Sequence, residues 1–243
     1  MTKLSVNINK IALLRNSRGR NFPDVAAFAA RCLELGAHGI TLHPRPDQRH
    51  ARDSDVEILK HVCDARGAEL NVEGYPSAPF LGMVSRARPA QCTLVPDAPG
   101  QLTSDHGWDL NKHADIIRAA VGVLKPLGIR VSLFVDYENP DIALAQELGA
   151  DRVELYTEPY AEHFGTAHGE AVLQGFAHAA AAARSAGLGV NAGHDLNLDN
   201  LGRFLEIPGI LEVSIGHALI VECIEHGVAN VIPRYVDIVS AAT

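Results

Sequence analysis

The stretch Leu35-Gly-Ala-His-Gly-Ile40 contains the end of one element and the start of the next: a leucine that closes a helix-like segment, a glycine, and an apolar run typical of a strand. The arrangement returns at Leu127-Gly-Ile-Arg-Val131, Leu148-Gly-Ala-Asp-Arg-Val153 and Ala186-Gly-Leu-Gly-Val190. Glycine often ends helices because it adopts left-handed backbone angles without a steric penalty. Four such junctions indicate repeated β/α units and a parallel sheet.

Short strand-like runs and helix-like segments alternate along the whole chain. The predicted strands are residues 4–8, 39–43, 69–73, 91–95, 130–135, 152–156, 189–191 and 211–215. The predicted helices include residues 23–35, 54–66, 112–127, 142–148, 170–186 and 199–206. Asp53 or Ser54 is expected to cap the second of these helices. The glycines expected to end helices are Gly36, Gly67, Gly128, Gly149 and Gly187.

Eight β/α units of roughly 30 residues fill a chain of this length, which favours an α/β fold of the (β/α)8 TIM-barrel type. We expect one domain over residues 1–243, with extra helical segments and a long loop at 96–108 after the fourth strand. A doubly wound open sheet is the alternative, but no early Gly-x-Gly-x-x-Gly fingerprint supports it. A loop of that length in a compact barrel is typically a functional lid, and a surface insertion is the other interpretation.

The composition of the chain argues against some classes of function. The chain has 243 residues, 47% of them hydrophobic, and a formal net charge of −8, which argues against sequence-independent nucleic-acid binding. Four cysteines without metal-ligand spacing are typical of buried thiols in a reducing compartment. No signal peptide or membrane-spanning run is recognisable. We therefore predict a cytoplasmic protein without a membrane partner.

Polar side chains that can exchange protons or bind phosphate follow two of the first predicted strands. His43 ends the second predicted strand, Arg45 follows it, and Glu73 ends the third. Imidazole titrates near neutral pH, a guanidinium grips phosphate, and a desolvated carboxylate becomes a base. Because the carboxyl ends of barrel strands meet at one mouth, these residues are candidates for a site. A solvated proline-rich turn and an ordinary loop carboxylate are the alternatives.

Two Gly-His steps, Gly193-His194 and Gly216-His217, close the last two predicted strands. Glycine permits close approach of the backbone to a ligand, and a following helix N-terminus directs N–H groups toward an anion. The pair therefore predicts a phosphate site. Zinc is a lesser alternative, since His43, His194, His217 and Glu73 could meet at the mouth, although no His-x-His or His-Glu-x-x-His pair is present.

Amide and basic side chains follow the first strand. Asn7 and Asn9 lie on one side if the chain stays extended, and Arg15 and Arg18 lie on one side if it turns helical. Arg18 is a candidate for phosphate contact, and either arginine could also be a solvated surface charge.

Together these motifs resemble one family. They are Val6-Asn-Ile-x-x-Ile-Ala-x-Leu-Arg-Asn-x-Arg-Gly19, Gly39-Ile-Thr-x-His-x-Arg-x-Asp-x-Arg-His50, Leu94-Val-Pro96, Val190-Asn-Ala-Gly-His194 and Ile215-Gly-His-Ala-x-Ile220. In this order they are similar to those of the pyridoxine 5′-phosphate synthases of vitamin B6 biosynthesis, over nearly the whole chain.

The resemblance implies a transferase that condenses 1-deoxy-D-xylulose 5-phosphate with 3-amino-2-oxopropyl phosphate, giving pyridoxine 5′-phosphate, inorganic phosphate and water. It implies no metal or organic cofactor, a homo-octamer, and a closing loop after strand four. The implied catalytic groups are the proton acceptors His43 and Glu73 and the proton donor His194. The implied contacts to the aminoketone phosphate are Asn7, Arg18, the backbone of Asp195, Gly216 and His217. Those to the deoxyxylulose phosphate are Arg45, His50, Thr103, Asn9 and Lys10.

Some positions depart from the family pattern. Many members have Asp-His at Asn9-Lys10, glycine at Asp195 and His-Thr-Gly at Tyr156-Thr-Glu158; the chain resembles an Asn-Lys branch that keeps the other motifs. Lys10 is expected to be a plain cation at the substrate, with a Schiff-base nucleophile as the alternative. The Asp195 side chain is expected to turn away from phosphate.

Two other functions remain open at this point. One is a metal-dependent aldolase or isomerase acting on a phosphosugar, which a stoichiometric metal and inhibition by chelator would support. The other is a non-catalytic phosphosugar-binding paralogue, which tight binding without turnover would support.

Overall fold

In the computed structural model, which describes residues 1–97, 101 and 104–242, eight parallel strands close into a barrel in sequence order. The strands are β1 (Lys3–Asn7), β2 (Gly39–Leu42), β3 (Glu69–Gly74), β4 (Gln91–Leu94), β5 (Arg130–Val135), β6 (Arg152–Tyr156), β7 (Gly189–Gly193) and β8 (Ile210–Ile215). Closure pairs β1 with β8, Leu4 lying opposite Val213. The predicted TIM barrel is confirmed.

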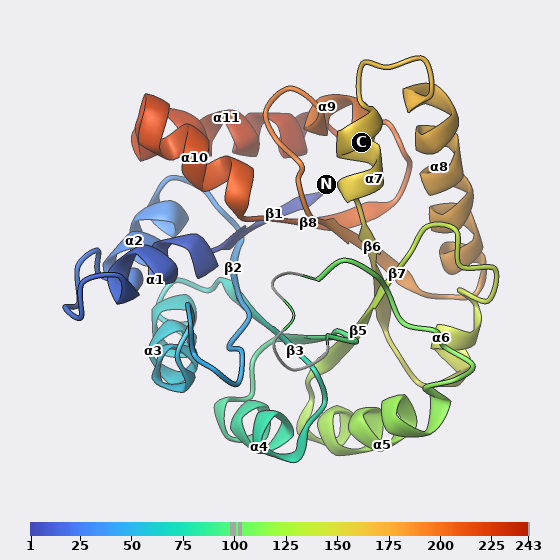
Figure 1. The fold of residues 1–243 in the computed structure, drawn as a ribbon, viewed down its shortest axis with the longest axis horizontal. Helices are drawn as coiled ribbons and strands as arrows, with labels where there is room; N and C mark the ends of the chain where they lie inside the picture. Colours follow the sequence, from blue (N-terminus) through green and yellow to red (C-terminus); the bar gives the residue numbers. More distant parts are fainter. Residues whose placement is uncertain (98–100, 102–103, 243) are drawn as a thin grey trace.

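Helices surround the barrel (Figure 1). They are α1 (Asn9–Asn16), α2 (Val25–Glu34), α3 (Asp53–Asp64), α4 (Ala78–Ala87), α5 (Ala114–Leu124), η1 (Lys125–Leu127), α6 (Leu144–Glu147), α7 (Glu158–His163), α8 (Gly169–Ser185), α9 (Leu201–Phe204), α10 (His217–His226) and α11 (Val228–Ala241). The described residues of the predicted loop at 96–108 form neither helix nor strand, and α5 begins two residues later than the predicted helix at 112–127.

Helix boundaries follow local chemistry. The side chain of Asp24 caps α2 by accepting from the N–H of Ala27 at 3.0 Å. The five glycines predicted to end helices all have positive φ, from 63° to 103°, as a left-handed cap requires. The predicted cap of α3, Asp53 or Ser54, was wrong by one or two residues. Arg52 occupies that position because the Asp55 carboxylate reaches back to its N–H at 2.8 Å.

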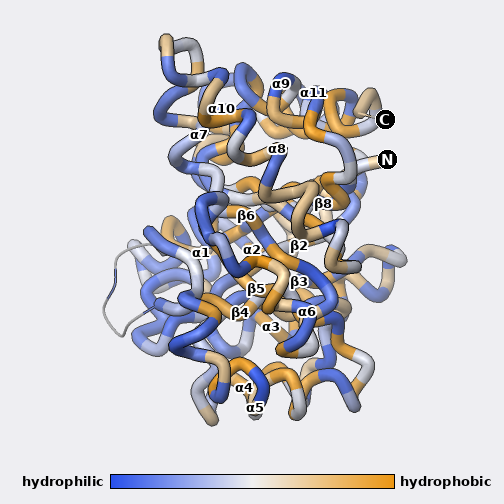
Figure 2. Tube along the Cα trace, turned by 90° about the vertical axis from the view of Figure 1, so that its right-hand side faces the viewer, coloured by the Kyte–Doolittle hydropathy of each residue, from blue (hydrophilic) through white to orange (hydrophobic). Residues whose placement is uncertain are grey.

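The apolar core lies between the barrel and the helices. Strand side chains such as Val6, Ile40 and Val72 are fully buried there. In Figure 2 hydrophobic colour runs along strands at the centre of the molecule, and many of the outer turns are hydrophilic. Burying this apolar surface is the main force that holds the helices on the barrel.

The barrel interior is polar, although bulky aliphatic residues fill most barrels of this type. The hydroxyls of Ser5 and Thr41 lie 2.6 Å apart, and Thr93 donates to Asn71 at 3.1 Å and to Glu154 at 3.3 Å. Buried polar groups are tolerated when they bond to one another. Polar, hydrogen-bonding side chains therefore continue from the mouth into the interior of the barrel.

Candidate active site

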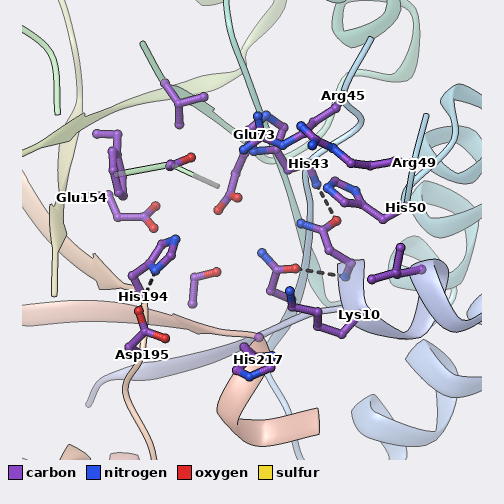
Figure 3. Close-up of a pocket in the computed structure, with 18 residues that line it drawn as sticks. Lys10, His43, Arg45, Arg49, His50, Glu73, Glu154, His194, Asp195 and His217 are labelled. Atoms are coloured by element: carbon purple, nitrogen blue, oxygen red, sulfur yellow. Dashed lines mark hydrogen bonds and ion pairs between the residues drawn. The ribbon is translucent and has the colours of Figure 1, made fainter. Parts of the chain in front are cut away.

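A pocket of about 480 Å³ lies at the carboxyl ends of the strands, and Figure 3 shows the side chains around it. Its size suits one or two small ligands. Its lining residues are Asn7, Asn9, Lys10, Leu13, His43, Arg45, Arg49, His50, Glu73, Val95, Ser104, Phe134, Glu154, His194, Asp195, Ser214, Gly216 and His217. Of the sequence-predicted residues that the structure describes, all but Arg18 therefore meet in one place.

One side of the pocket is cationic and is held by the segment after β4. The guanidinium of Arg45, nearly buried, donates to the Asp97 carboxylate at 2.5 Å and to the Gln101 carbonyl at 3.1 Å. Ser104 donates to the same carboxylate at 2.8 Å, and Arg49 donates to the Gln101 carbonyl. A phosphate at this side would meet a guanidinium whose position is already fixed by a buried ion pair.

Two histidines next to these arginines are neutral near pH 7. Burial, and then the neighbouring charge of Arg45, holds the pKa of His43 well below its ordinary value and lowers that of His50 to about 4. The Nδ1 atom of His50 accepts from the N–H of Ala51 at 2.9 Å, so its ring proton is on Nε2. His43 can therefore accept a proton, and His50 can donate a hydrogen bond to an anion.

Two buried carboxyls also line the pocket: Glu73 lies beside His43, and Glu154 comes from β6 on another side (Figure 3). Burial, and then the proximity of Glu154, raises the pKa of Glu73 well above its ordinary value. Burial, and then Glu212, raises the pKa of Glu154 to about 8. A Cβ atom on Gly193 would lie 2.4 Å from Oε1 of Glu154, so β7 needs glycine here to leave room for this carboxyl.

The end of β7 carries His194 and Asp195, whose consecutive φ angles of 94° and 58° are uncommon for residues other than glycine. Nδ1 of His194 lies 2.9 Å from Oδ2 of Asp195. The Asp195 side chain thus turns toward the imidazole. Phe134 and Tyr156, with ring centroids 5.4 Å apart, form an apolar wall beside it.

The end of β8 leads directly into α10, whose first residue is His217 and whose N-cap is Gly216. Among the described residues no side chain caps this helix, so the N–H groups of its first turn, beside the pocket that Gly216 and His217 line, are left for another hydrogen-bond acceptor. A Cβ on Gly216 would lie 3.1 Å from Cβ of Asn7, so a larger residue here would have to displace the Asn7 side chain. The ammonium of Lys10 lies nearby in Figure 3.

The first β/α segment differs in part from its prediction. Asn9 begins α1 and is not a continuation of the strand, because the Asn7 side chain accepts from the Asn9 N–H at 3.0 Å. The Asn9 side chain still reaches the site, where it accepts from the N–H of His43 at 3.0 Å. Arg18 is exposed just after α1 and does not line the pocket.

Arg15 and Thr103 have different outcomes. Arg15 is not a surface charge: it is 2% exposed and bonds both oxygens of the Asp55 carboxylate, at 2.6 and 2.9 Å. Thr103 lies outside the residues that the structure describes.

Sequence reasoning missed Glu154, Arg49, Ser104, Phe134 and Ser214. A signal existed for Glu154, since alternation along β6 places it on the same side as Tyr156 at the strand end. Within the described part of the chain, no group of three or more His, Cys, Asp or Glu side chains is arranged to hold a metal ion. His43, His194, His217 and Glu73 line the pocket without forming such a group.

A parallel barrel with acid–base and cationic groups at the carboxyl ends of its strands defines a (β/α)8-barrel enzyme. Residues 4–241 match the family described as pyridoxal phosphate biosynthesis protein PdxJ. The chain belongs to this family.

Among curated relatives, the pyridoxine 5′-phosphate synthase of Xanthomonas axonopodis pv. citri is 54% identical over 245 residues, covering 98% of this chain and 96% of that protein. That of Xylella fastidiosa is 50% identical over 248 residues, covering 99% and 95%. Among solved structures, a thiamine phosphate pyrophosphorylase from Pyrococcus furiosus has a TM-score of 0.66 at 16% identity, covering 99% and 96%. This last likeness shows the fold alone.

Proposed function

We propose that this chain is a pyridoxine 5′-phosphate synthase that joins 1-deoxy-D-xylulose 5-phosphate to 3-amino-2-oxopropyl phosphate, releasing inorganic phosphate and water. Relatives with this name match nearly the full chain. The observation that carries the proposal is one pocket lined by acid–base groups, by the cationic Arg45 and Arg49, and by Gly216 and His217 at the start of α10. Holding both substrates in one pocket removes much of the entropic barrier to their reaction.

The two anion sites suit two different phosphates. Arg45 and His50 form the site proposed for the deoxyxylulose phosphate, with Asn9 and Lys10 near the rest of that substrate. The N-terminus of α10, at Gly216 and His217, forms the site proposed for the aminoketone phosphate, together with Asn7 and the backbone of Asp195. Figure 3 shows Arg45 and His217 on opposite sides of the pocket.

The acid–base groups suit the reaction, because an amine must add to a ketone, oxygens must leave and carbon-bound protons must move. Neutral His43 is proposed to accept a proton. Glu73, whose pKa is raised by burial, is proposed as the second acceptor, since a raised pKa makes a carboxylate a stronger base. His194 is proposed to donate a proton to a leaving oxygen. Lys10 is proposed to contact substrate as a cation.

We also propose a homo-oligomer, an octamer by family resemblance. Exposed apolar side chains lie on α1, on the segment after it and on α10, which contacts α1: Leu14 is 51% exposed, Phe22 81% and Ile224 74%. Such a surface is typical of subunit contacts. Arg18, exposed beside it, is proposed to reach the substrate of a neighbouring subunit. Light scattering on the purified protein measures the assembly, and a monomer would contradict this proposal.

A cytoplasmic location is also proposed. The four cysteines are free thiols, as in a reducing compartment. Among the described helices, none has the length and apolar character needed to span a bilayer.

The reaction is tested by incubating purified protein with both phosphorylated substrates and measuring pyridoxine 5′-phosphate by chromatography. We expect product from the native chain and a fall in kcat of about 100-fold or more for His43→Ala, with smaller changes in KM. Glu57→Gln, at an exposed position on α3, is the control. Folded native protein that binds both substrates without forming product would refute the proposal.

A further inference from the structure

The turn after β7 brings two neighbouring side chains face to face. His194 and Asp195 both have left-handed backbone angles, φ 94° and φ 58°. Such angles persist outside glycine only where the surrounding structure imposes them, and they concentrate at functional sites. Their effect here is an ion-pair geometry between adjacent residues, with Nδ1 of His194 2.9 Å from Oδ2 of Asp195.

Hydrogen bonds from two other loops fix this turn. The hydroxyl of Thr157 donates to the Gly193 carbonyl at 2.8 Å and also to the His194 carbonyl. The side-chain amide of Asn200 donates to the Asp195 carbonyl at 3.2 Å. The carboxylate of Asp195 is therefore held beside the imidazole by the fold and not by chance rotation of an exposed side chain.

The chemistry of the contact determines where the ring carries its proton. The hydrogen bond from His194 lowers the pKa of Asp195, so the carboxyl is ionised at neutral pH and can only accept. Nδ1 of His194 must then be the donor. Figure 3 shows the other ring nitrogen turned away from Asp195, on the side of Glu154. The ring of Tyr156 packs edge-on against the imidazole at 5.1 Å between centroids.

We propose that the side chain of Asp195 is a positioning residue: it keeps a proton on Nδ1 of His194 and holds the ring so that Nε2 faces the pocket. The inference rests on the proposed function, in which His194 is the proton donor. In that step the Nε2–H bond of the protonated ring breaks and the proton forms a bond to an oxygen of the substrate. The C–O bond then breaks, and its electron pair leaves with that oxygen. The ring is left neutral, with its proton on Nδ1 accepted by Asp195.

Other ionisable groups also face this pair and remain in every variant below. They are Glu154 and Tyr156 from β6, Glu158 bonded to Tyr156, His43 after β2, Lys10 from α1 and His217 from α10. Asp195 differs from them in being hydrogen-bonded to Nδ1 directly.

The test compares native protein with Asp195→Gly and Asp195→Asn. Glycine adopts a φ of 58° without strain and asparagine tolerates it, so both are expected to fold. Glu225→Gln is the matched control, because it removes the carboxylate of another sequential pair, with His226 on the exposed end of α10, at 3.8 Å. Thermal unfolding confirms that each variant is folded.

We expect kcat to fall about 10- to 100-fold in both Asp195 variants, while KM for each substrate changes by less than about threefold. The Glu225→Gln control keeps the native kcat and KM. A kcat in Asp195→Gly within about twofold of the native value would overturn the proposal.

A second readout does not depend on turnover. In ¹⁵N-histidine spectra, with the His194 signals assigned by their loss in His194→Gln, the neutral ring of native protein should carry its proton on Nδ1. In Asp195→Gly that signal should move toward the Nε2-protonated form. A native ring protonated on Nε2 would overturn the proposal about Asp195. Absence of product from native protein with the expected tautomer would instead count against the proposed function.

Discussion

The carboxyl of Glu154 makes the protein less stable as the pH rises, and this is open to direct measurement. The group is 3% exposed, and burial followed by the charge of Glu212 raises its pKa from 4.5 to about 8. The folded chain therefore keeps a proton that the unfolded chain loses. Stability from this group is fully present below about pH 4.5 and is lost as the pH rises to about 8.

The loss of stability is set by the pH interval over which the folded and unfolded chains differ in the protonation of Glu154. Between 4.5 and pH 7 the loss accumulates at about 1.36 kcal/mol per pH unit, or about 3 kcal/mol in total. Glu154→Gln removes the titrating group and keeps the shape and the acceptor for the Thr93 hydroxyl. The variant should equal the native protein in stability near pH 4.5 and exceed it by about 3 kcal/mol at pH 7.

Urea unfolding at pH 5, 6, 7 and 8, followed by the fluorescence of the buried Trp108, measures this difference. Glu57→Gln, on the exposed face of α3, controls for the loss of a negative charge by itself. Glu73 remains in the variant, where burial still raises its pKa but the charge of Glu154 no longer adds to that rise. Parallel stability curves for native protein and Glu154→Gln across this range would refute the reasoning about the buried carboxyl.

Three further outcomes are expected. Asp55→Ala leaves the buried guanidinium of Arg15 without its partner and should lower the unfolding free energy by about 3–5 kcal/mol in urea; a loss under about 1 kcal/mol would contradict the structural role of the pair. Gly193→Ala places a methyl 2.4 Å from the Glu154 carboxylate and should lower the unfolding free energy by about 1–3 kcal/mol and remove most of the activity. Gly202→Ala, where a Cβ meets nothing within 4 Å, is the matched control. Native activity in Gly193→Ala would count against a catalytic need for this carboxyl position. Prolonged treatment with a chelator should leave turnover unchanged, and activity lost to chelator and restored by metal would favour the metal-dependent alternative.

The fold could be predicted largely from local signals. The predicted strand over residues 130–135 matches β5 to the residue, and Gly36 and Gly149 end helices with the left-handed angles that their junctions required. These features depend on the spacing of hydrophobic residues and on the backbone angles that glycine allows, and both can be recognised in the sequence. The segment at Asn9 was mispredicted because a side-chain bond from Asn7 starts a helix there, which no periodicity shows.

The site was predictable only in part. His43, Glu73 and His194 stand at strand ends, where position alone indicates a role. Glu154 was missed because it lies inside a strand, and its importance depends on the polar barrel interior and on its neighbour Glu73. Arg15 and Arg18 are equivalent in the sequence, and only the packing of Asp55 separates a buried ion pair from an exposed charge.

The central claim is that one pocket holds two phosphates with the acid–base groups between them. A crystal structure of the protein soaked with inorganic phosphate tests this most directly. We expect two anions, one bonded to Arg45 and His50 and the other to the first turn of α10 at Gly216 and His217. Anions bound only outside this pocket, or a first turn of α10 that stays without one at saturating phosphate, would contradict it.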